Sequence, residues 1–200
     1  MRRYRDYYIA KWLLVVILLT TTLALPACAC PATPSTTTLA SVTFPDTNLE
    51  AVIRETIDKP EGSIYTSEFE SLAVLDARER GINDLTGLEY CLNLRELDLE
   101  NNNISDISAL VGLNILQELN LKNNNISDIS ALASLANLEG LYLNNNNISD
   151  ISALVNNVGL AVGDGMNLQN NPLSAKSINA YIPQLEARGV FVHSGIYPDE

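Results

Sequence analysis

The sequence Asn-Asn-Asn-Ile-Ser-Asp-Ile-Ser-Ala-Leu at residues 101–110 recurs without change at residues 123–132 and 145–154. The copies are 22 residues apart, and a fixed period of this length is typical of proteins built from stacked coils. One coil cannot bury its own apolar side chains, so neighbouring coils must stack to form a continuous core. The repeat therefore predicts a solenoid.

The apolar residues change rhythm within each period. Leu97 and Leu99 alternate with polar residues, as in a strand with one buried side. Ile104, Ile107 and Leu110 then follow at steps of three, which favours a tight helical or 3₁₀ return on the opposite side of the coil. Each period thus predicts one strand and one short helical return.

This pattern, LxxLxLxxNxIxxIxxLxxL, resembles the leucine-rich repeat in the 22-residue form known from bacterial internalins. The resemblance implies an α/β fold, namely a right-handed leucine-rich-repeat solenoid. Its parallel sheet would be concave, its convex side would consist of 3₁₀ turns or short helices, and a helical cap would precede the repeats. It also implies that one column of Asn amides ties the turns of adjacent coils together, because an amide supplies both a donor and an acceptor to buried backbone. This structural column consists of Asn102, Asn124, Asn146 and Asn171.

The residues before the clean repeats predict a cap for the open apolar end of the first coil. Residues 42–71 contain a helical pattern whose N-cap is either Thr47, as part of a capping box, or Asp46. A second short helix is expected over residues 67–72. A degenerate repeat follows, in which Arg80 replaces the column Asn.

The pattern also changes at the far end of the chain. After Leu154 the register slips by three residues and recovers at Met166. Residues 174–188 predict a longer helical return that Pro183 kinks or divides. Residues 190–192 predict the last strand.

The chain begins with a segment typical of a secretory signal. Residues 1–11 carry four basic side chains, and Trp12–Leu19 is an unbroken apolar run that is short for a bilayer span. Leu25-Pro26-Ala27-Cys28 resembles a bacterial lipobox, in which Cys28 becomes a lipidated residue that anchors the protein to a membrane. Ala27-Cys28-Ala29 offers ordinary signal peptidase a competing site, so secretion without lipid stays open, as does an uncleaved anchor. All three alternatives place residues 28–200 outside the cytoplasm.

These patterns divide the chain into five segments. They are a signal peptide (1–27), a flexible linker (28–41), a helical cap (42–71), leucine-rich repeats with a C-terminal cap (72–193) and a tail (194–200). We expect the protein to be a monomer.

The charge of the chain restricts its partners. Residues 1–27 hold four of the 12 basic and one of the 24 acidic side chains, which leaves 8 basic against 23 acidic residues in the rest. This balance argues against nucleic acid and anionic lipid surfaces, and favours a partner with a basic surface. Three Cys residues do not make a disulfide framework. Cys91 falls in a core column, where we expect it to be inert.

The sequence offers little for catalysis. His193 is the only His, and no Cys or Asp stands at a ligand spacing from it. Asp106 recurs as Asp128 and Asp150, but calcium needs several oxygens converging in one loop. Each of these carboxylates is expected to cap its own 3₁₀ turn instead. We therefore expect that the protein is not an enzyme and that it binds no metal ion and no cofactor.

The outward side chains of the strands are the candidate binding residues, because they differ between coils whose convex loops are identical. The candidates are Asp76, Arg78, Glu96, Asp98, Glu100, Glu118, Asn120, Lys122, Tyr142 and Asn144. One hypothesis is a protein-binding module. The alternative is a carbohydrate- or cell-wall-binding module in which Tyr142 stacks on a sugar and Asn120, Asn144 and Glu118 hydrogen-bond it.

Overall fold

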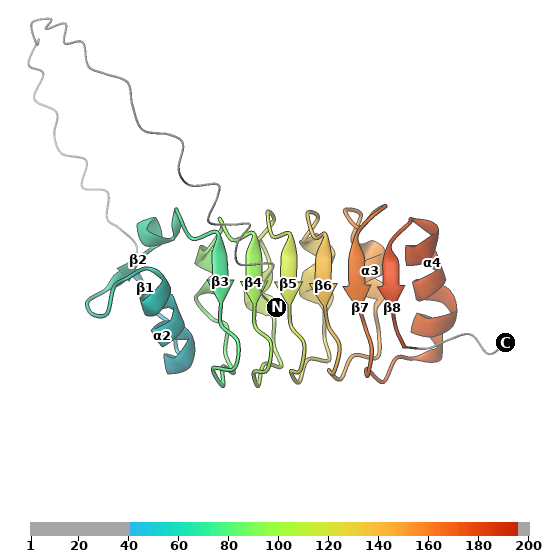
Figure 1. The fold of residues 1–200 in the computed structure, drawn as a ribbon, viewed down its shortest axis with the longest axis horizontal. Helices are drawn as coiled ribbons and strands as arrows, with labels where there is room; N and C mark the ends of the chain where they lie inside the picture. Colours follow the sequence, from blue (N-terminus) through green and yellow to red (C-terminus); the bar gives the residue numbers. More distant parts are fainter. Residues whose placement is uncertain (1–40, 196–200) are drawn as a thin grey trace, which may run out of the picture. The chain divides into compact units, whose positions relative to one another are not determined.

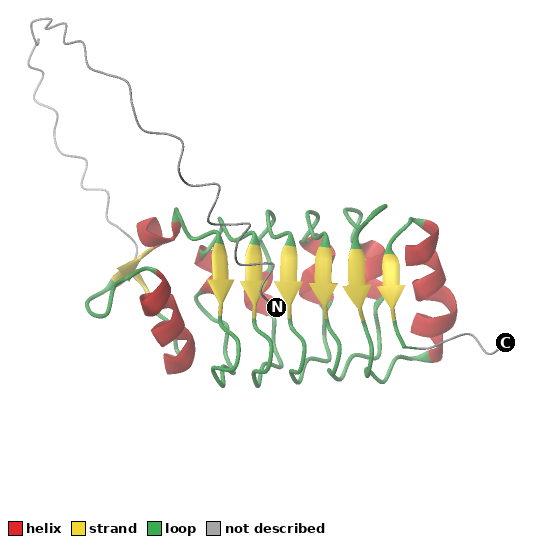
Figure 2. Cartoon of the chain, in the orientation of Figure 1, coloured by secondary structure: helices red, strands yellow, loops and turns green. Residues whose placement is uncertain are grey.

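The computed structural model describes residues 41–195, so the predicted signal peptide, the Cys28 anchor and the linker before residue 41 lie outside the described residues. Six parallel strands, paired in chain order, form one sheet in front of a row of short helices (Figures 1 and 2). The strands are β3 (Val74–Asp76), β4 (Glu96–Asp98), β5 (Glu118–Asn120), β6 (Gly140–Tyr142), β7 (Gly165–Asn167) and β8 (Phe191–His193). Within residues 41–195 no helix is long and apolar enough to cross a membrane. The predicted solenoid with a parallel sheet is confirmed.

The strand register follows the sequence repeat. Leu97 pairs with Leu119, and Leu119 pairs with Leu141, so each step along the sheet advances the chain by one period. Leu141 pairs with Met166, which confirms the predicted slip of three residues. The side chains that face outward therefore lie in straight rows across the strands.

The returns on the convex side are short helices, as the steps of three predict. They are η2 (Leu88–Tyr90), η3 (Ser108–Leu110), η4 (Ser130–Ser134) and α3 (Ser152–Asn156). The first three are 3₁₀ turns and the fourth is a short α-helix. The backbone N–H of Ser108 donates to Asp106 Oδ1 at 2.8 Å, and the two equivalent carboxylates accept the same bond at the same distance. Each carboxylate thus satisfies the first N–H of its turn, as expected, from the position one residue before the N-cap.

The core is the stack of Leu and Ile columns between the sheet and the returns. Leu119, Ile126 and Leu132 are fully buried, and their counterparts are buried as well except at the C-terminal end, where Leu173 and Val192 are partly buried. Cys91 lies in this core, where burial, with a contribution from Glu89, raises the pKa of its thiol to about 12. The thiolate is the reactive form of cysteine, so burial and the raised pKa both disfavour reaction at Cys91.

The N-terminal cap contains more structure than the sequence predicts. Strand β1 (Ser41–Val42) pairs antiparallel with β2 (Ile64–Tyr65), a pairing not predicted. Helix α2 (Thr47–Thr56) lies between these two strands in the chain, and η1 (Thr66–Phe69) is shorter and earlier than the helix predicted over residues 67–72. Asp46 caps α2 by accepting the N–H groups of Asn48 and Leu49. Of the two predicted N-cap residues, Asp46 is therefore the correct one.

The C-terminal return is one helical run over residues 175–187 that contains a π-helical turn. A π-helical turn, η5 (Ser177–Tyr181), precedes α4 (Ile182–Ala187), and Pro183 is the second residue of α4. Proline lacks an N–H, but the backbone on both sides of the junction at Tyr181 and Ile182 keeps right-handed helical angles, so Pro183 does not divide the return. Strand β8 begins one residue later than predicted, because the N–H of Val190 donates to the carbonyl of Leu185 at the end of α4. The guanidinium of Arg188 donates to the carbonyls of Val155 and Asn157 and so ties the end of α4 to the preceding return.

Candidate functional site

The outward side chains of the sheet, here called the concave face, form two rows along the strands and a third just after them. The row at the start of the strands holds Val74, Glu96, Glu118, Gly140, Gly165 and Phe191. The row at the end of the strands holds Asp76, Asp98, Asn120, Tyr142, Asn167 and His193. The third row holds Arg78, Glu100, Lys122, Asn144 and Gln169. The fold thus brings the predicted candidates together on adjacent strands.

Two basic side chains neutralise much of the acidic half of this face. Arg78 forms a two-pronged pair with Asp76, with Nε–Oδ1 and Nη2–Oδ2 distances of 2.9 and 2.7 Å, and lies 3.6 Å from Asp98 Oδ2. Lys122 Nζ lies 2.7 Å from Glu100 Oε1. The Arg78 hydrogen bond lowers the pKa of Asp76, and the Lys122 hydrogen bond lowers that of Glu100. These carboxylates are ionised, but their charge is balanced within the protein.

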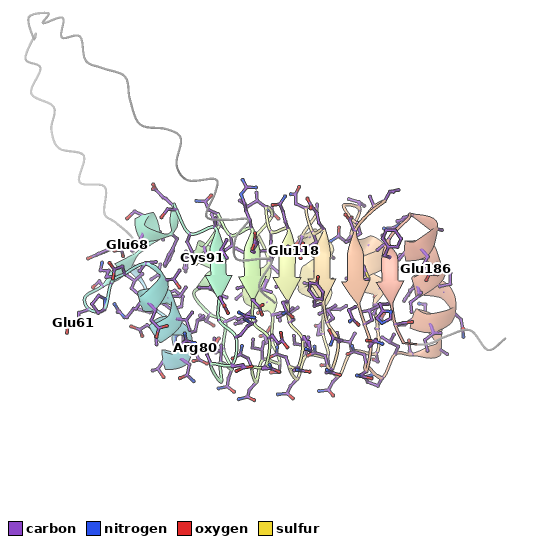
Figure 3. The ribbon with its side chains drawn as sticks, in the orientation of Figure 1. Glu61, Glu68, Arg80, Cys91, Glu118 and Glu186 are labelled. Atoms are coloured by element: carbon purple, nitrogen blue, oxygen red, sulfur yellow. The ribbon has the colours of Figure 1, made fainter. Side chains whose placement is uncertain are left out.

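Glu96 and Glu118 are different, because neither forms a salt bridge with any Lys or Arg of residues 41–195. They are neighbours in the first row, and Glu118 lies toward the end of the sheet where the strands begin (Figure 3). Burial, together with the like charges of Glu96 and Glu139, raises the pKa of Glu118. The uncompensated negative charge of the concave face is therefore concentrated in this row.

Tyr142 interrupts a regular hydrogen-bond series in the second row. The side chains of Asp76, Asp98, Asn120 and Asn167 each accept the backbone N–H two residues further on, at 3.0–3.3 Å. This bond closes the turn after the strand. Tyr142 has no short acceptor to close the same turn, and its side chain is 47% exposed. The ring replaces a structural contact with an exposed aromatic surface.

Asn144 is less available than the sequence suggests. Its side chain is only 8% exposed, so it offers a partner little surface. Its Oδ1 atom is buried and has no hydrogen-bond partner among the described residues. Asn120 is also occupied, because it accepts from the N–H of Lys122 and donates to Glu100 Oε2 at 3.2 Å.

The Asn column at the turns links adjacent coils through buried hydrogen bonds. Asn124 Nδ2 donates to the carbonyls of Leu99 and Leu121 at 3.0 and 3.1 Å, and Asn124 Oδ1 accepts the N–H of Ile104 at 3.0 Å. Leu99 and Leu121 belong to successive coils, so one amide joins both. The same three bonds are made by Asn102, Asn146 and Asn171.

A second Asn column, not identified from the sequence, runs beside the first. Its members have φ values of 55–59°, in the left-handed region, which Asn tolerates better than most residues. They are Asn101, Asn123, Asn145 and Asn170. Their amides form a chain in which each donates to the preceding one, and Asn101 donates to Glu79. The signal was present in the sequence, because each of these residues directly precedes a member of the first column, Asn102, Asn124, Asn146 or Asn171.

The described residues offer no obvious metal site. No group of three or more His, Cys, Asp or Glu side chains within residues 41–195 is arranged to hold a metal ion. His193 lies at the exposed end of β8, in register with Asn167.

Comparison with protein families explains this architecture. Residues 93–113 match the model of the Leucine Rich Repeat, and residues 116–156 match a model of two copies of Leucine Rich repeats. These segments are leucine-rich repeats. No curated protein matched the chain.

Solved structures with leucine-rich repeats share the fold. An internalin from Listeria monocytogenes is 28% identical with a TM-score of 0.54, over 75% of this chain and 56% of that one. The functional domain of InlJ from the same organism is 23% identical with a TM-score of 0.57, over 68% of this chain and 31% of that one. The chain thus spans about half the length of the internalin structure and about a third of the length of the InlJ structure. A leucine-rich-repeat fold of this kind is typical of protein-binding modules.

Proposed function

We propose that this leucine-rich-repeat protein is a non-catalytic, extracytoplasmic module that binds another protein through its concave face. The observation that carries the proposal is the contrast between carboxylates on that face. Asp76 and Glu100 are balanced by cations of the chain itself, whereas Glu96 and Glu118 form no salt bridge within residues 41–195. Carboxylates left without a cation favour a partner with a basic surface.

Tyr142 supports the same proposal. Aromatic side chains tend to dominate the binding energy of protein interfaces, and Tyr142 is exposed at a position where other coils use a short polar residue. The convex loops offer no comparable variation, because three of them have the same sequence. We assign Tyr142 the role of anchor, and Glu96 and Glu118 the role of steering the encounter.

The leader supports the extracytoplasmic part of the proposal. The basic residues and the apolar run are typical of an exported protein, and the Leu-Pro-Ala-Cys sequence ending at Cys28 resembles a lipobox. The lipid at Cys28 would hold the repeats at a membrane surface, with residues 29–40 as the tether.

The test begins with the mature protein immobilised as bait for a native envelope extract. Once a partner is captured, surface plasmon resonance at two salt concentrations separates the two roles. Tyr142→Ala should leave capture almost unchanged and speed release. Glu96→Lys combined with Glu118→Lys should slow capture most at low salt, because screening removes the difference at high salt.

The matched control is the pair Asp106→Ala and Asp128→Ala on the convex side. If this control abolishes binding while the concave variants leave it intact, the assignment of the concave face is wrong.

Carbohydrate binding is the second candidate, since an exposed Tyr142 beside Gly140 could stack on a sugar ring. Its hydrogen-bonding residues are less suited to it, because Asn120 is occupied and Asn144 is buried. Binding of the mature protein to a glycan array, lost in Tyr142→Ala, would favour this candidate over a protein partner.

A further inference from the structure

Glu118 is folded across its neighbour Gly140. A Cβ atom on Gly140 would lie 2.0 Å from Glu118 Oε2 and 2.6 Å from Glu118 Cδ, so the carboxylate occupies the space of the missing side chain. The φ of Gly140 is not in the left-handed region, so its backbone does not demand glycine. What glycine supplies here is room for the carboxylate of the adjacent strand, directly on the sheet.

The sheet beside this carboxylate is uncovered. Gly165 is the partner of Gly140 on the next strand, and a Cβ on Gly165 would meet no atom within 4 Å. Tyr142 stands two residues after Gly140 on the same side of the strand, which places their Cα atoms about 6.6 Å apart. Glu118, Tyr142 and the bare backbone of Gly165 therefore border one small area of the concave face.

Other carboxylates on the concave face are paired with basic side chains of the chain itself. Arg78 uses two nitrogens to contact both oxygens of Asp76, and Lys122 contacts Glu100. Glu118 has no such contact within residues 41–195, and it faces the like charges of Glu96 and Glu139. A cation from outside the chain would relieve this repulsion.

We infer that Glu118, Tyr142 and the glycine floor of Gly140 and Gly165 form a subsite for one arginine side chain of the protein partner. This inference rests on the proposed function and specifies its chemistry. A guanidinium is planar, so it can stack on the Tyr142 ring and present two N–H groups to the Glu118 carboxylate. A lysine ammonium cannot make both contacts in this way, and a neutral group gains no ion pair.

The test uses the full chain, labelled with ¹⁵N, and a small probe in place of the partner. N-acetyl-arginine amide is titrated while the amide resonances of Gly140, Tyr142 and Gly165 are followed. We expect these resonances to shift and to saturate at millimolar probe. N-acetyl-citrulline amide, which has the same shape without the charge, should produce no saturating shift.

Two variants test the geometry. Glu118→Gln should weaken binding of the arginine probe about 5- to 10-fold, since it removes a charge-assisted pair. Gly140→Ala should also weaken binding while the charge of Glu118 is kept, because the new methyl group displaces the carboxylate. The clash is with the flexible end of a side chain, so Gly140→Ala is expected to fold, and its melting curve checks this. Asp128→Asn, on the convex side, is the control and should bind the probe as wild type does.

Three results would overturn the subsite: equal binding of the citrulline probe, tighter binding of N-acetyl-lysine amide, or unchanged binding in Glu118→Gln. The proposed function fails separately. If the captured partner binds Glu118→Gln as it binds wild type but loses affinity in Tyr142→Ala, the concave interface stands without the arginine subsite. If no substitution on the concave face changes binding of the partner, the proposed function is wrong, even if the arginine probe binds.

Discussion

The carboxylate of Asp46 accepts a hydrogen bond from the backbone N–H of Asn83 at 2.7 Å. The same Oδ2 atom accepts from Asp84 at 3.1 Å, while Oδ1 caps helix α2 through Asn48 and Leu49. One side chain thus fastens the N-terminal cap to the first coil. Burial alone would raise the pKa of Asp46, but the four N–H donors outweigh it and lower the pKa below its ordinary value of 3.8.

Replacement of Asp46 should loosen the cap. We expect Asp46→Asn to lower the free energy of unfolding by about 2 kcal/mol at pH 7, because an amide cannot accept all four bonds. A lowered carboxyl pKa gives stability that is present above 3.8 and is lost as the pH falls through the folded-state value. Denaturant melts at pH 7 and at pH 3 should show the gap between wild type and variant shrinking in acid.

Thr47→Ala is the control for this prediction, since Thr47 is the first residue of α2 and Asp46 is its cap. We expect a change within about 0.5 kcal/mol. A larger loss in Thr47→Ala than in Asp46→Asn would contradict the role of Asp46.

The Leu columns should be costly to break. Leu119 is fully buried and pairs with Leu97 and Leu141 on the two adjacent strands. Leu119→Ala should destabilise the protein by about 2–5 kcal/mol through a cavity between coils. Val111→Ala, at a side chain that is 53% exposed, should cost less than about 0.5 kcal/mol. Similar midpoints for the two variants in urea melts would show that the core register is wrong.

The inner Asn column should stabilise the protein through hydrogen bonds. Asn124→Ala leaves the carbonyls of Leu99 and Leu121 and the N–H of Ile104 without this partner, at a cost of about 1–3 kcal/mol. The next residue, Asn125, has an exposed side chain, so Asn125→Ala is a matched control in the same run. Thermal unfolding followed by circular dichroism measures both. Equal stability of Asn124→Ala and wild type would contradict a stabilising role for the hydrogen bonds of this column.

The leader should direct lipidation. Metabolic labelling with a fatty-acid probe should mark the wild-type protein, and Cys28→Ala should abolish the label and accumulate precursor. Cys30→Ala, two residues further on, should be labelled as wild type is. Mature protein that begins after Cys28 and carries no lipid would instead support secretion by ordinary signal peptidase.

Much of the fold could be predicted because the 22-residue period of the sequence is also the structural repeat of the solenoid. A spacing of 22 residues between Leu97 and Leu119 is also the register of the two strands, and stacking requires the same residues to be buried in each coil. The N-terminal pair β1 and β2 could not be found this way, because two-residue strands outside the repeat have no period of their own.

The candidate site was harder to predict than the fold. The sequence identifies which side chains face outward, but pairing between coils decides what they present. Lys122 reaches Glu100 across 22 residues of sequence and removes its charge from the surface. Asn144 occupies an outward position and is nevertheless buried. Such outcomes depend on the lengths of neighbouring side chains, which differ from coil to coil.

The identity of successive coils also determines how this protein can change in evolution. Because the turns and their Asn bonds are the same in three repeats, loss or duplication of one whole repeat would leave every junction chemically unchanged. Neighbouring strands lie about 4.8 Å apart, so each such event would move the Arg78 end of the face relative to Tyr142 by one fixed increment. The number of coils therefore sets the length of the binding surface, which gain or loss of a repeat changes in equal steps while the packing between coils stays the same.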